Sequence, residues 1–315
     1  MINPAFVRYY EILYTVLIMD TFVDSQVRFM LGDYYGVSEV DPPPLSELLP
    51  TKNGKVGAIS HIQFIEEANK RCWTRPYIIS SEYDEHFDKK MFLISHSRLY
   101  GHRGNPLFPF RTSIPLGQCM YVDDTTTFHN KKNIVFWRGS TTGYYGMDNL
   151  KDNLRYKFVS ELFDAHNVDI GFSGFCQDVY EKWKPEYLKF GKGHVDIKEQ
   201  TVNKFILCLE GNTFPSNLGW VLSSNCCPII AYPFEFECYI HGQNLVPWKH
   251  FIPVKRDLTD FKEILDWCLK DENQQKCEEI AKAGKLYMAP YNDQELYKKV
   301  IDTFFDMLPW IRGGI

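Results

Sequence analysis

The sequence predicts an α/β fold built on a parallel β-sheet in the second half of the chain. Short apolar runs bounded by turn residues alternate there with segments whose apolar residues recur at helical spacing. Strand, turn and helix in repetition favour parallel strands with helices on both faces of the sheet. Two of the turns that follow expected strands also combine glycine with serine or threonine. At about 150 residues per domain, a chain of 315 residues is long enough for two domains.

The expected strands are short apolar runs, each followed by a turn. In chain order they cover residues 133–137, 168–172, 204–209, 228–232 and 250–254. Three helices are expected, over residues 148–167, over residues 217–224 and from residue 261 onward. Ser216 is expected to cap the second of these helices, and Asp260 and Glu263 form the expected capping box of the third.

The first half of the chain is less regular. Helical and irregular segments alternate there with short apolar runs at residues 77–79 and 91–94, and three prolines at residues 42–44 mark a loop. The apolar run at residues 12–19 is too short to span a bilayer, so we expect a buried helix there and no transmembrane segment. A polar run at residues 123–133 separates this half from the regular second half.

Composition limits the class of partner. The chain has 40 acidic and 35 basic residues, a formal net charge of −5, whereas a domain that binds DNA or RNA through its phosphates is usually basic. We therefore expect no nucleic-acid partner, although a small anionic ligand held by a few cations remains compatible. The nine cysteines are odd in number, form no C-x-x-C motif and follow no secretory signal, which favours reduced thiols and a cytoplasmic protein. Aromatic residues make up 16% of the chain, which fits either core packing or stacking platforms for sugar or base rings.

The two glycine-bearing turns cover residues 138–143 and 211–216. Ligands of parallel sheets bind outside the carboxyl ends of the strands, and free N–H groups at a helix N-terminus suit phosphate. Neither turn has the spacing of a P-loop or of the G-x-G-x-x-G motif. The spacing alone leaves a phosphate or nucleotide site and ordinary tight turns as open alternatives.

Three sequence blocks carry a resemblance to a known family. The first is FWRGSTTG at residues 136–143 with Arg155 further on, the second is KFILCLEGNT at residues 204–213, and the third is LVPWKHFIPV at residues 245–254. Together they resemble glycosyltransferase family 90, which includes Rumi-like protein O-glucosyltransferases, fungal xylosyltransferases and bacterial lipopolysaccharide glycosyltransferases. The resemblance covers residues 130–295 and does not extend to residues 1–75.

The resemblance implies a GT-B architecture, in which two Rossmann-like domains hold the donor in the cleft between them. Residues 1–130 would form an N-terminal acceptor-side domain, residues 131–290 a C-terminal UDP-sugar-binding domain, and residues 291–315 a helix that packs back on the N-terminal domain. The implied reaction is an inverting transfer from a UDP-sugar to a hydroxyl of a glycan or glycoprotein acceptor, with no metal and no cofactor besides the UDP-sugar co-substrate. The family suggests xylose or glucose as the donor sugar. We favour xylose, and a microbial or viral cytoplasmic enzyme.

The resemblance also assigns residues to the UDP-sugar. Residues of the first block would lie along the diphosphate and sugar, those of the second turn would frame the nucleotide, and two residues after the next strand would hold the ribose. The assigned residues are Arg138, Gly139, Ser140, Thr141, Thr142, Arg155, Gly211, Asn212, Thr213, Ser216, Asn217, Glu235 and Phe236. Asn217 departs from the family pattern, because many relatives have a phosphate-binding arginine there. Arg138, Arg155 or a nearby lysine would have to replace that arginine.

The expected catalytic base is a carboxylate that deprotonates the acceptor hydroxyl. In Rumi-like relatives it is an aspartate before Tyr-Pro, just after an apolar strand. Placing Tyr83 on the family tyrosine makes Glu82 the base, and Asp84 lies two residues further on, on the same side of an extended segment. Glu82 and Asp84 therefore both remain candidates.

Two other functions remain open. A metal-dependent GT-A glycosyltransferase would use an acidic motif such as Glu82-x-Asp84 or Asp123-Asp124 to hold a hard cation, although the two glycine-bearing turns fit that fold poorly. A non-catalytic carbohydrate-binding protein could have kept the fold and lost the reaction, which the asparagine at position 217 would allow.

Overall fold

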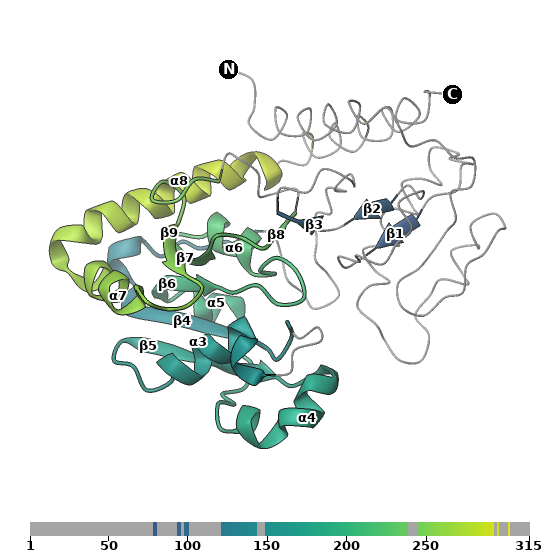
Figure 1. Cartoon of the computed structure of the whole chain (residues 1–315). Coiled ribbons are helices and arrows are strands. Elements are labelled where there is room, and N and C mark those ends of the chain that lie inside the picture. The colour runs from purple at the N-terminus through teal and green to yellow at the C-terminus, as the bar shows by residue number, and fades with distance from the viewer. Residues whose placement is uncertain are drawn as a thin grey trace. The chain divides into compact units, whose positions relative to one another are not determined.

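The computed structural model (Figure 1) describes residues 78–80, 93–95, 98–100, 121–143, 149–238, 245–292, 295 and 302. The chain divides into two compact units. The first comprises Met1–Cys119, Phe236–Gly242 and Pro290–Ile315, and the second comprises Met120–Glu235 and Gln243–Ala289. The expected helix at residues 12–19 lies outside the described residues, as do most of residues 291–315.

The described part of the first unit contains two short strand pairs. β1 (Ile78–Ser80) pairs in parallel with β2 (Leu93–Ser95), and β3 (Arg98–Leu99) pairs antiparallel with β8 (Phe236–Glu237). β1 and β2 coincide with the two apolar runs in the first half of the sequence. β8 brings a segment from late in the chain into this unit.

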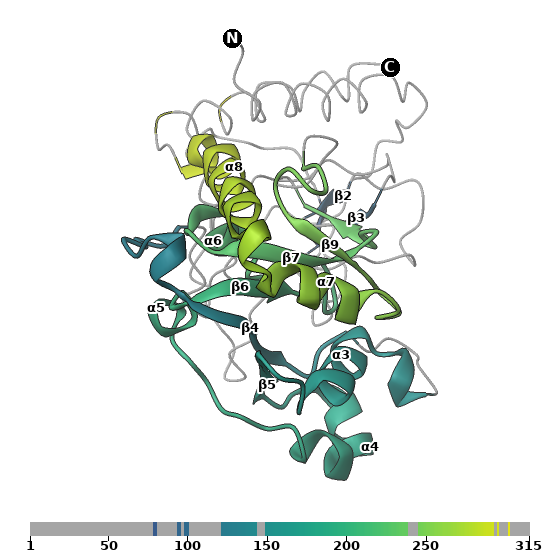
Figure 2. The ribbon, with the colours of Figure 1, turned by 90° about the vertical axis from the view of Figure 1, so that its left-hand side faces the viewer.

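The second unit is built on a five-stranded sheet with the strand order β5-β4-β6-β7-β9 (Figure 2). The strands are β4 (Lys132–Ser140), β5 (Val168–Gly174), β6 (Asn203–Cys208), β7 (Cys227–Tyr232) and β9 (Ile252–Lys255). Every strand pair in this sheet is parallel, so the expected α/β class and the five expected strands are confirmed. Since β4 lies between β5 and β6, the chain changes direction across the sheet between β4 and β6.

Helices connect these strands. They are η3 (Phe128–Asn130), η4 (Leu150–Asp152), α3 (Leu154–Leu162), α4 (Gln177–Leu188), α5 (Ile197–Gln200), α6 (Leu218–Ser223), α7 (Phe261–Leu269), η5 (Asp271–Asn273) and α8 (Gln274–Asn292). α3 begins later than the apolar pattern predicts because Asn153 caps it, with Oδ1 accepting the Tyr156 N–H at 2.9 Å. α4 was not expected, since Pro185 inside it normally ends a helix. The structure absorbs this proline with a non-helical backbone at Trp183.

Both expected helix caps are wrong. Asn217, not Ser216, holds the N-cap position of α6, and it makes no capping bond because its Nδ2 donates to the Leu207 carbonyl at 3.0 Å. Asp260 holds the N-cap position of α7, but its Oδ1 accepts the Lys255 N–H at 2.9 Å rather than a helix N–H. In both cases a neighbouring strand takes the side chain that the local pattern assigns to the helix.

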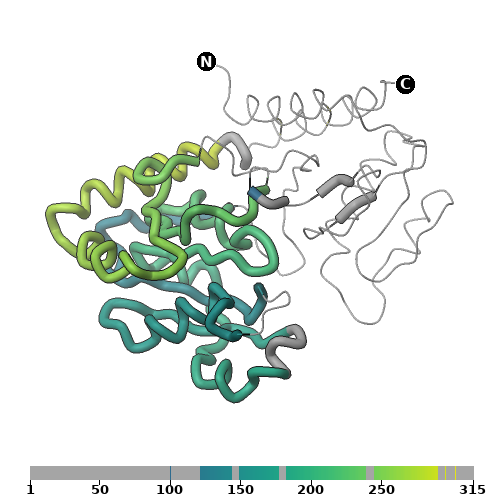
Figure 3. The backbone as a smooth tube through the Cα atoms, viewed as in Figure 1, coloured from purple at the N-terminus to yellow at the C-terminus, as the bar shows by residue number. Residues whose placement is uncertain are grey.

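The hydrophobic core lies on one face of the sheet, where alternate strand residues meet α3, α7 and α8 (Figure 3). Phe172 packs edge to face on Trp137, with ring centroids 5.9 Å apart, and on Tyr187 at 5.1 Å. α6 contacts β7, and its residues are all buried. The largest fully buried side chains are Tyr187, Phe128, Phe158, Phe172, Phe205 and Phe251. For these residues the core-packing interpretation of the aromatic excess is confirmed.

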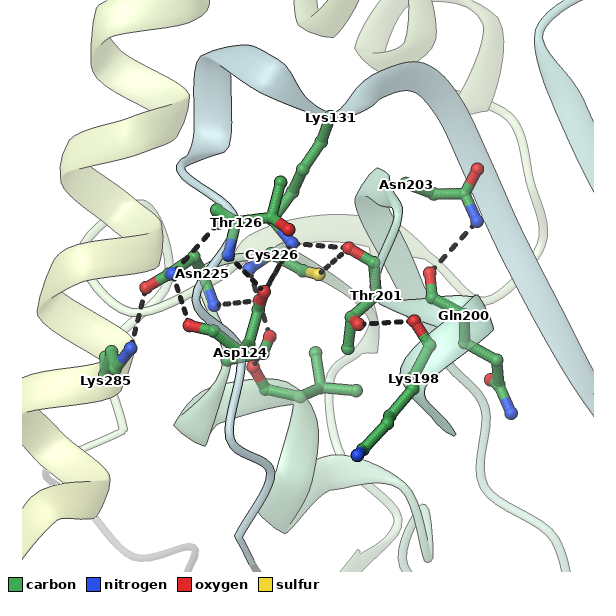
Figure 4. A network of polar contacts seen from close by, with 12 residues as sticks. Asp124, Thr126, Lys131, Lys198, Gln200, Thr201, Asn203, Asn225, Cys226 and Lys285 are labelled. Carbon is green, nitrogen blue, oxygen red and sulfur yellow. Dashed lines mark hydrogen bonds and ion pairs between the residues drawn. The ribbon is translucent and has the colours of Figure 1, made fainter. Parts of the chain in front are cut away.

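A buried polar network lies at the amino ends of the strands (Figure 4). The Lys131 Nζ pairs with the Asp124 carboxylate at 2.8 Å and also donates to the Thr201 carbonyl. Asp124 accepts the Asn225 N–H at 2.8 Å, and the Asn225 Oδ1 accepts from the Lys285 Nζ of α8 at 2.8 Å. The network therefore joins the residues before β4, β6 and β7 to α8, at the edge of the sheet opposite to the one where ligands of such sheets bind.

The third sequence block forms the turn that leads into β9. The buried His250 accepts the Val246 N–H at Nδ1, at 2.9 Å, and its ring lies on Tyr287 of α8 with centroids 5.0 Å apart. Burial, and secondarily the charge of Lys249, lower the pKa of His250 from 6.5 to about 4. A neutral imidazole therefore joins this turn to α8.

Two further findings concern the described ranges as a whole. No helix there has both the length and the apolar character needed to cross a bilayer. Every cysteine in the same ranges is a free thiol, as the odd cysteine count favours.

Candidate functional site

The carboxyl ends of the five strands of the second unit meet at one edge of the sheet, because all of these strands are parallel. Sheets with this strand order bind ligands at the point where the chain changes direction, here between β4 and β6. The two glycine-bearing turns follow these two strands, since β4 ends at Ser140 and β6 ends at Cys208. The tertiary structure thus brings the two turns together at the switch point of the sheet.

The two turns pack directly against each other, and this contact explains their glycines. Gly143 has a φ of +97°, which glycine adopts without strain. A Cβ on Gly143 would lie 3.2 Å from the Gly211 backbone, and a Cβ on Gly211 would lie 2.5 Å from the Thr142 Oγ1 and 2.6 Å from the Arg155 Nη2. The Asn212 Oδ1 also accepts the Gly143 N–H at 2.8 Å. Glycine at both positions lets the two backbones approach this closely.

Arg155 of α3 ties the two turns together. On the first turn, its Nη1 donates to the Ser140 carbonyl at 3.0 Å and to the Thr142 Oγ1 at 2.6 Å. On the second turn, its Nε donates to the Glu210 carbonyl at 3.1 Å and its Nη2 to the Leu209 carbonyl at 3.2 Å. Arg155 is only 7% exposed. We refer to this residue with its four acceptors as the Arg155 strap.

The Arg155 guanidinium keeps its charge in this position. Burial lowers the pKa of Arg155 from 12.5 to about 10, and the nearby Cys176 and Glu210 partly offset that effect. The group is therefore protonated at neutral pH and brings a buried positive charge to the carboxyl edge. It also lies over the Trp137 ring, 5.7 Å from the centroid. Since these hydrogen bonds go to protein oxygens, a direct bond from Arg155 to phosphate stays a prediction.

Arg138 is engaged with β5 rather than with the second turn. Its Nη2 pairs with the Asp169 Oδ1 at 2.8 Å, its Nη1 donates to the Asp169 carbonyl at 3.1 Å, and its guanidinium lies 4.6 Å from the Phe136 ring centroid. Lys192 pairs with the same carboxylate at 2.8 Å. Burial raises the pKa of Asp169, but the hydrogen bonds from Lys192 and Arg138 outweigh burial, so that the pKa is lowered. The predicted contact of Arg138 with a diphosphate therefore rests on the resemblance alone.

The other residues of the first turn shape its backbone. Thr141 is fully buried, and its Oγ1 both donates to the Cys176 carbonyl and accepts the Cys176 N–H, each at 2.9 Å. A Cβ on Gly139 would lie 2.4 Å from the Trp137 ring, so a larger residue does not fit there. Ser140 is half-buried, and its carbonyl accepts from the Arg155 strap.

The second turn is closed by a hydrogen bond from the Gly211 N–H to the Thr213 carbonyl at 3.0 Å. Thr213 and Ser216 are half-buried. Asn217 directs its amide back to the Leu207 carbonyl, so it supplies no charge in place of the arginine that many relatives carry.

A charged group that sequence analysis did not identify lies beside the second turn. The Glu210 side chain is 2% exposed and accepts the Glu235 N–H at 3.0 Å. Arg256 pairs with Glu210 through Nη1 and with the Glu235 Oε2 through Nη2, the latter at 2.6 Å. We call these residues the Glu210–Arg256–Glu235 cluster. Each lies just after the end of an expected strand, at the edge where parallel strands place their ligands, and this position was the available signal.

The remaining predicted site residues do not join this edge in the described structure. Phe236 begins β8 of the first unit, where it is buried and pairs with Leu99. Glu82 and Asp84, the two candidate bases, lie outside the described residues.

The acidic pair considered as a metal motif is occupied by other contacts. Asp124 lies at the amino edge of the sheet and is ion-paired with Lys131 at 2.8 Å, with the Asp124 side chain 2% exposed. Within the described part of the chain, no group of three or more histidine, cysteine or acidic side chains could hold a metal ion. Asp123-Asp124 therefore does not supply the metal site of the GT-A alternative.

The parallel sheet and the two turns joined at its switch point define an α/β protein with a Rossmann-type ligand edge. The model of glycosyl transferase family 90 matches residues 116–309, and the chain belongs to this family. The matched range includes both turns, the Arg155 strap and the Glu210–Arg256–Glu235 cluster. The resemblance that the three sequence blocks carry is thereby confirmed.

Relatives match different shares of the chain. O-glucosyltransferase LpsA of Dichelobacter nodosus is 24% identical over 189 residues, which are 59% of this chain and 53% of that protein. Uncharacterized protein 027R of Frog virus 3 is 46% identical over 187 residues, 52% of this chain and 18% of that protein. Human protein O-glucosyltransferase 3 is 45% identical over 78 residues, 22% of this chain and 15% of that protein. The chain thus spans about half, or less, of the length of these relatives.

Proposed function

We propose that this chain transfers a sugar from a UDP-sugar to a hydroxyl group of a glycan or glycoprotein acceptor. The observation that carries the proposal is the pair of glycine turns at the switch point, joined by the Arg155 strap, in a member of glycosyltransferase family 90. Free backbone N–H groups and a buried positive charge at such an edge suit a diphosphate. Two relatives named O-glucosyltransferases support the same chemistry.

In the proposed donor site, the turns contribute more through their backbones than through charged side chains. The diphosphate gains negative charge as its bond to the sugar breaks, and N–H groups already held in place stabilise that charge without reorganising. The Arg155 strap contributes a fixed positive charge and keeps both turns in position. The half-buried residues Ser140, Thr142, Thr213 and Ser216 are the proposed side-chain contacts at this edge.

The proposed reaction inverts the configuration of the anomeric carbon and needs no metal, on a GT-B arrangement of two domains. A carboxylate takes the proton of the acceptor hydroxyl, the acceptor oxygen forms a bond to the anomeric carbon, and UDP leaves from the opposite face with the bonding electrons. Glu82 and Asp84 remain the two candidates for this base.

Glucose is the better-supported donor sugar. The preference for xylose finds no support in the comparisons, because the relatives whose names state an activity are O-glucosyltransferases. The two sugars differ by one CH2OH group, and a pocket separates such ligands by about 1–3 kcal/mol, or about 5- to 150-fold in affinity. A difference of that size is measurable by direct titration.

The test is a calorimetric and thermal-shift titration of the purified chain with UDP, UDP-glucose, UDP-xylose, GDP and CMP, each with Mn2+ or with EDTA. A ligand that binds only the folded chain raises its apparent Tm. We expect UDP and UDP-glucose to raise the Tm in EDTA, and GDP and CMP to leave it unchanged. Binding that requires Mn2+ would favour the GT-A alternative. Binding of none of these nucleotides would overturn the proposed donor site.

Turnover distinguishes an enzyme from a binding protein with the same fold. The assay follows release of UDP from UDP-glucose in the presence of glycan acceptors, for the wild type and for Glu82→Gln and Asp84→Asn. We expect one of the two variants to lose turnover while its affinity for UDP persists. Wild-type activity in both would contradict the base assignment. UDP binding without any wild-type turnover would favour the carbohydrate-binding alternative.

A further inference from the structure

Two residues to which the family resemblance gives no role, Glu210 and Arg256, form ion pairs at the carboxyl edge. We propose that they are positioning residues, which fix the Glu235 carboxylate as the acceptor for the ribose hydroxyls of the donor nucleotide. This inference rests on the proposed function, because it requires a UDP-sugar at this edge of the sheet.

Glu210 holds the backbone of Glu235. The two oxygens of the Glu210 carboxylate accept the Glu235 N–H at 3.0 Å and 3.3 Å. The main-chain carbonyl of Glu210 accepts from the Arg155 Nε at 3.1 Å. The same residue is therefore tied to the strap between the two turns, and it sets the distance from those turns to Glu235.

Arg256 holds the side chain of Glu235. Its Nη1 pairs with the Glu210 carboxylate, and its Nη2 pairs with the Glu235 Oε2 at 2.6 Å. The planar guanidinium directs its N–H groups in fixed directions, so one arginine can bridge two carboxylates, whereas a lysine ammonium acts as a single point charge. The Glu210 side chain is 2% exposed, the Arg256 side chain 27% and the Glu235 side chain 53%. Exposure thus rises from the buried end of the cluster to Glu235.

The second oxygen of the Glu235 carboxylate, Oε1, is in a position to accept from a ligand. Within the described ranges, the side chain of Glu235 bonds only to Arg256, and it does so through Oε2. An ionised carboxylate only accepts hydrogen bonds, and the ribose of a nucleotide presents two adjacent hydroxyl donors. Two carboxylates and one guanidinium leave this cluster with an excess of negative charge. It therefore suits hydroxyl donors, while the phosphates belong beside the Arg155 strap.

The test compares the calorimetric affinities of UDP, 2′-deoxy-UDP and 3′-deoxy-UDP. For the wild type we expect the loss of a hydroxyl to weaken binding about tenfold or more, as for a hydrogen bond to a charged group. In Glu235→Gln and in Arg256→Gln this ratio should fall to about threefold or less. Lys255→Gln, which removes a positive charge from the exposed neighbouring residue, is the matched control and should keep the wild-type ratio.

Because Arg256→Gln leaves a buried carboxylate without its cation, we expect it to be destabilised. The double variant Glu210→Gln/Arg256→Gln removes both charges and keeps an acceptor for the Glu235 N–H, so it tests the same inference in a more stable chain. If Arg256 is merely structural, all three nucleotides weaken equally and the ratio stays at its wild-type value, which would overturn the inference. Wild-type UDP binding with no preference for the hydroxyls would overturn it while leaving the proposed function intact. Failure of the wild type to bind UDP would overturn both.

Discussion

Gly211→Ala tests the packing of the two turns directly. The added Cβ would lie 2.5 Å from the Thr142 Oγ1, 2.6 Å from the Arg155 Nη2 and 2.7 Å from the Arg155 Cζ. Ordinary van der Waals contact begins at 3.4 Å, so the approach of 2.5 Å requires a shift of about 0.9 Å. The Arg155 guanidinium cannot move freely, because its hydrogen bonds hold it to both turns.

Two costs add in this variant. Overpacking of a close-packed site costs about 1–3 kcal/mol. Displacement of the guanidinium weakens its 2.6 Å hydrogen bond to Thr142, and the loss of a hydrogen bond to a charged group costs about 1.5–3 kcal/mol. We therefore expect the free energy of unfolding to fall by about 2–5 kcal/mol. Because the turns lose their geometry, we also expect the affinity for UDP to fall by at least about tenfold.

Urea denaturation followed by circular dichroism measures the first quantity, and calorimetric titration with UDP measures the second. Gly174→Ala is the matched control, because Gly174 ends β5 at the same edge but a Cβ there would meet nothing within 4 Å. We expect this control to change the free energy of unfolding by less than about 1 kcal/mol. Equal stability and equal UDP affinity of the two variants would refute the described packing of the turns.

Two further predictions concern the amino edge of the sheet. In urea denaturation, Lys131→Met should lower the free energy of unfolding by about 3–5 kcal/mol, because it leaves the buried Asp124 carboxylate unpaired. Adding Asp124→Asn should recover part of this loss, and no recovery would contradict the attribution to the ion pair. His250 should make the chain less stable as the pH falls from 6.5 towards 4, because the unfolded chain binds a proton that the folded chain, with the lowered pKa of about 4, excludes. This loss is at most about 3 kcal/mol. His250→Asn keeps an acceptor for the Val246 N–H and should remove that part of the pH dependence, and an unchanged dependence would count against His250 as its source.

The sheet could be predicted because burial on both faces writes a strong local pattern. The runs at residues 204–209 and 228–232 are almost wholly apolar, and they became the strands β6 and β7, in which nearly every residue is buried. Helix starts were harder to predict, because a capping side chain has a choice of partners. Asp260 bonds to the end of β9, and the sequence near residue 260 does not show that this strand end lies within reach.

The candidate site shows the same division between local pattern and tertiary contact. Parallel strands place their carboxyl ends together, so the order of strands and turns along the sequence was enough to bring residues 138–143 and 211–216 to one edge. The part played by each arginine was not decided locally. Arg138 pairs with Asp169 because β5 lies next to β4, and Arg155 straps two turns because α3 brings it beside both.

The sequence by itself determined the fold class of the second unit, the family and the two turns at the carboxyl edge, because each depends on residue types at short spacing. Only the tertiary structure decided how the turns are held together and which charges meet. Glu210 and Arg256 are 46 positions apart in the chain, and neither local periodicity nor a motif links them. Their pairing depends on the order in which β6, β7 and β9 lie side by side, because a buried carboxylate is stable only where the fold brings a cation to it.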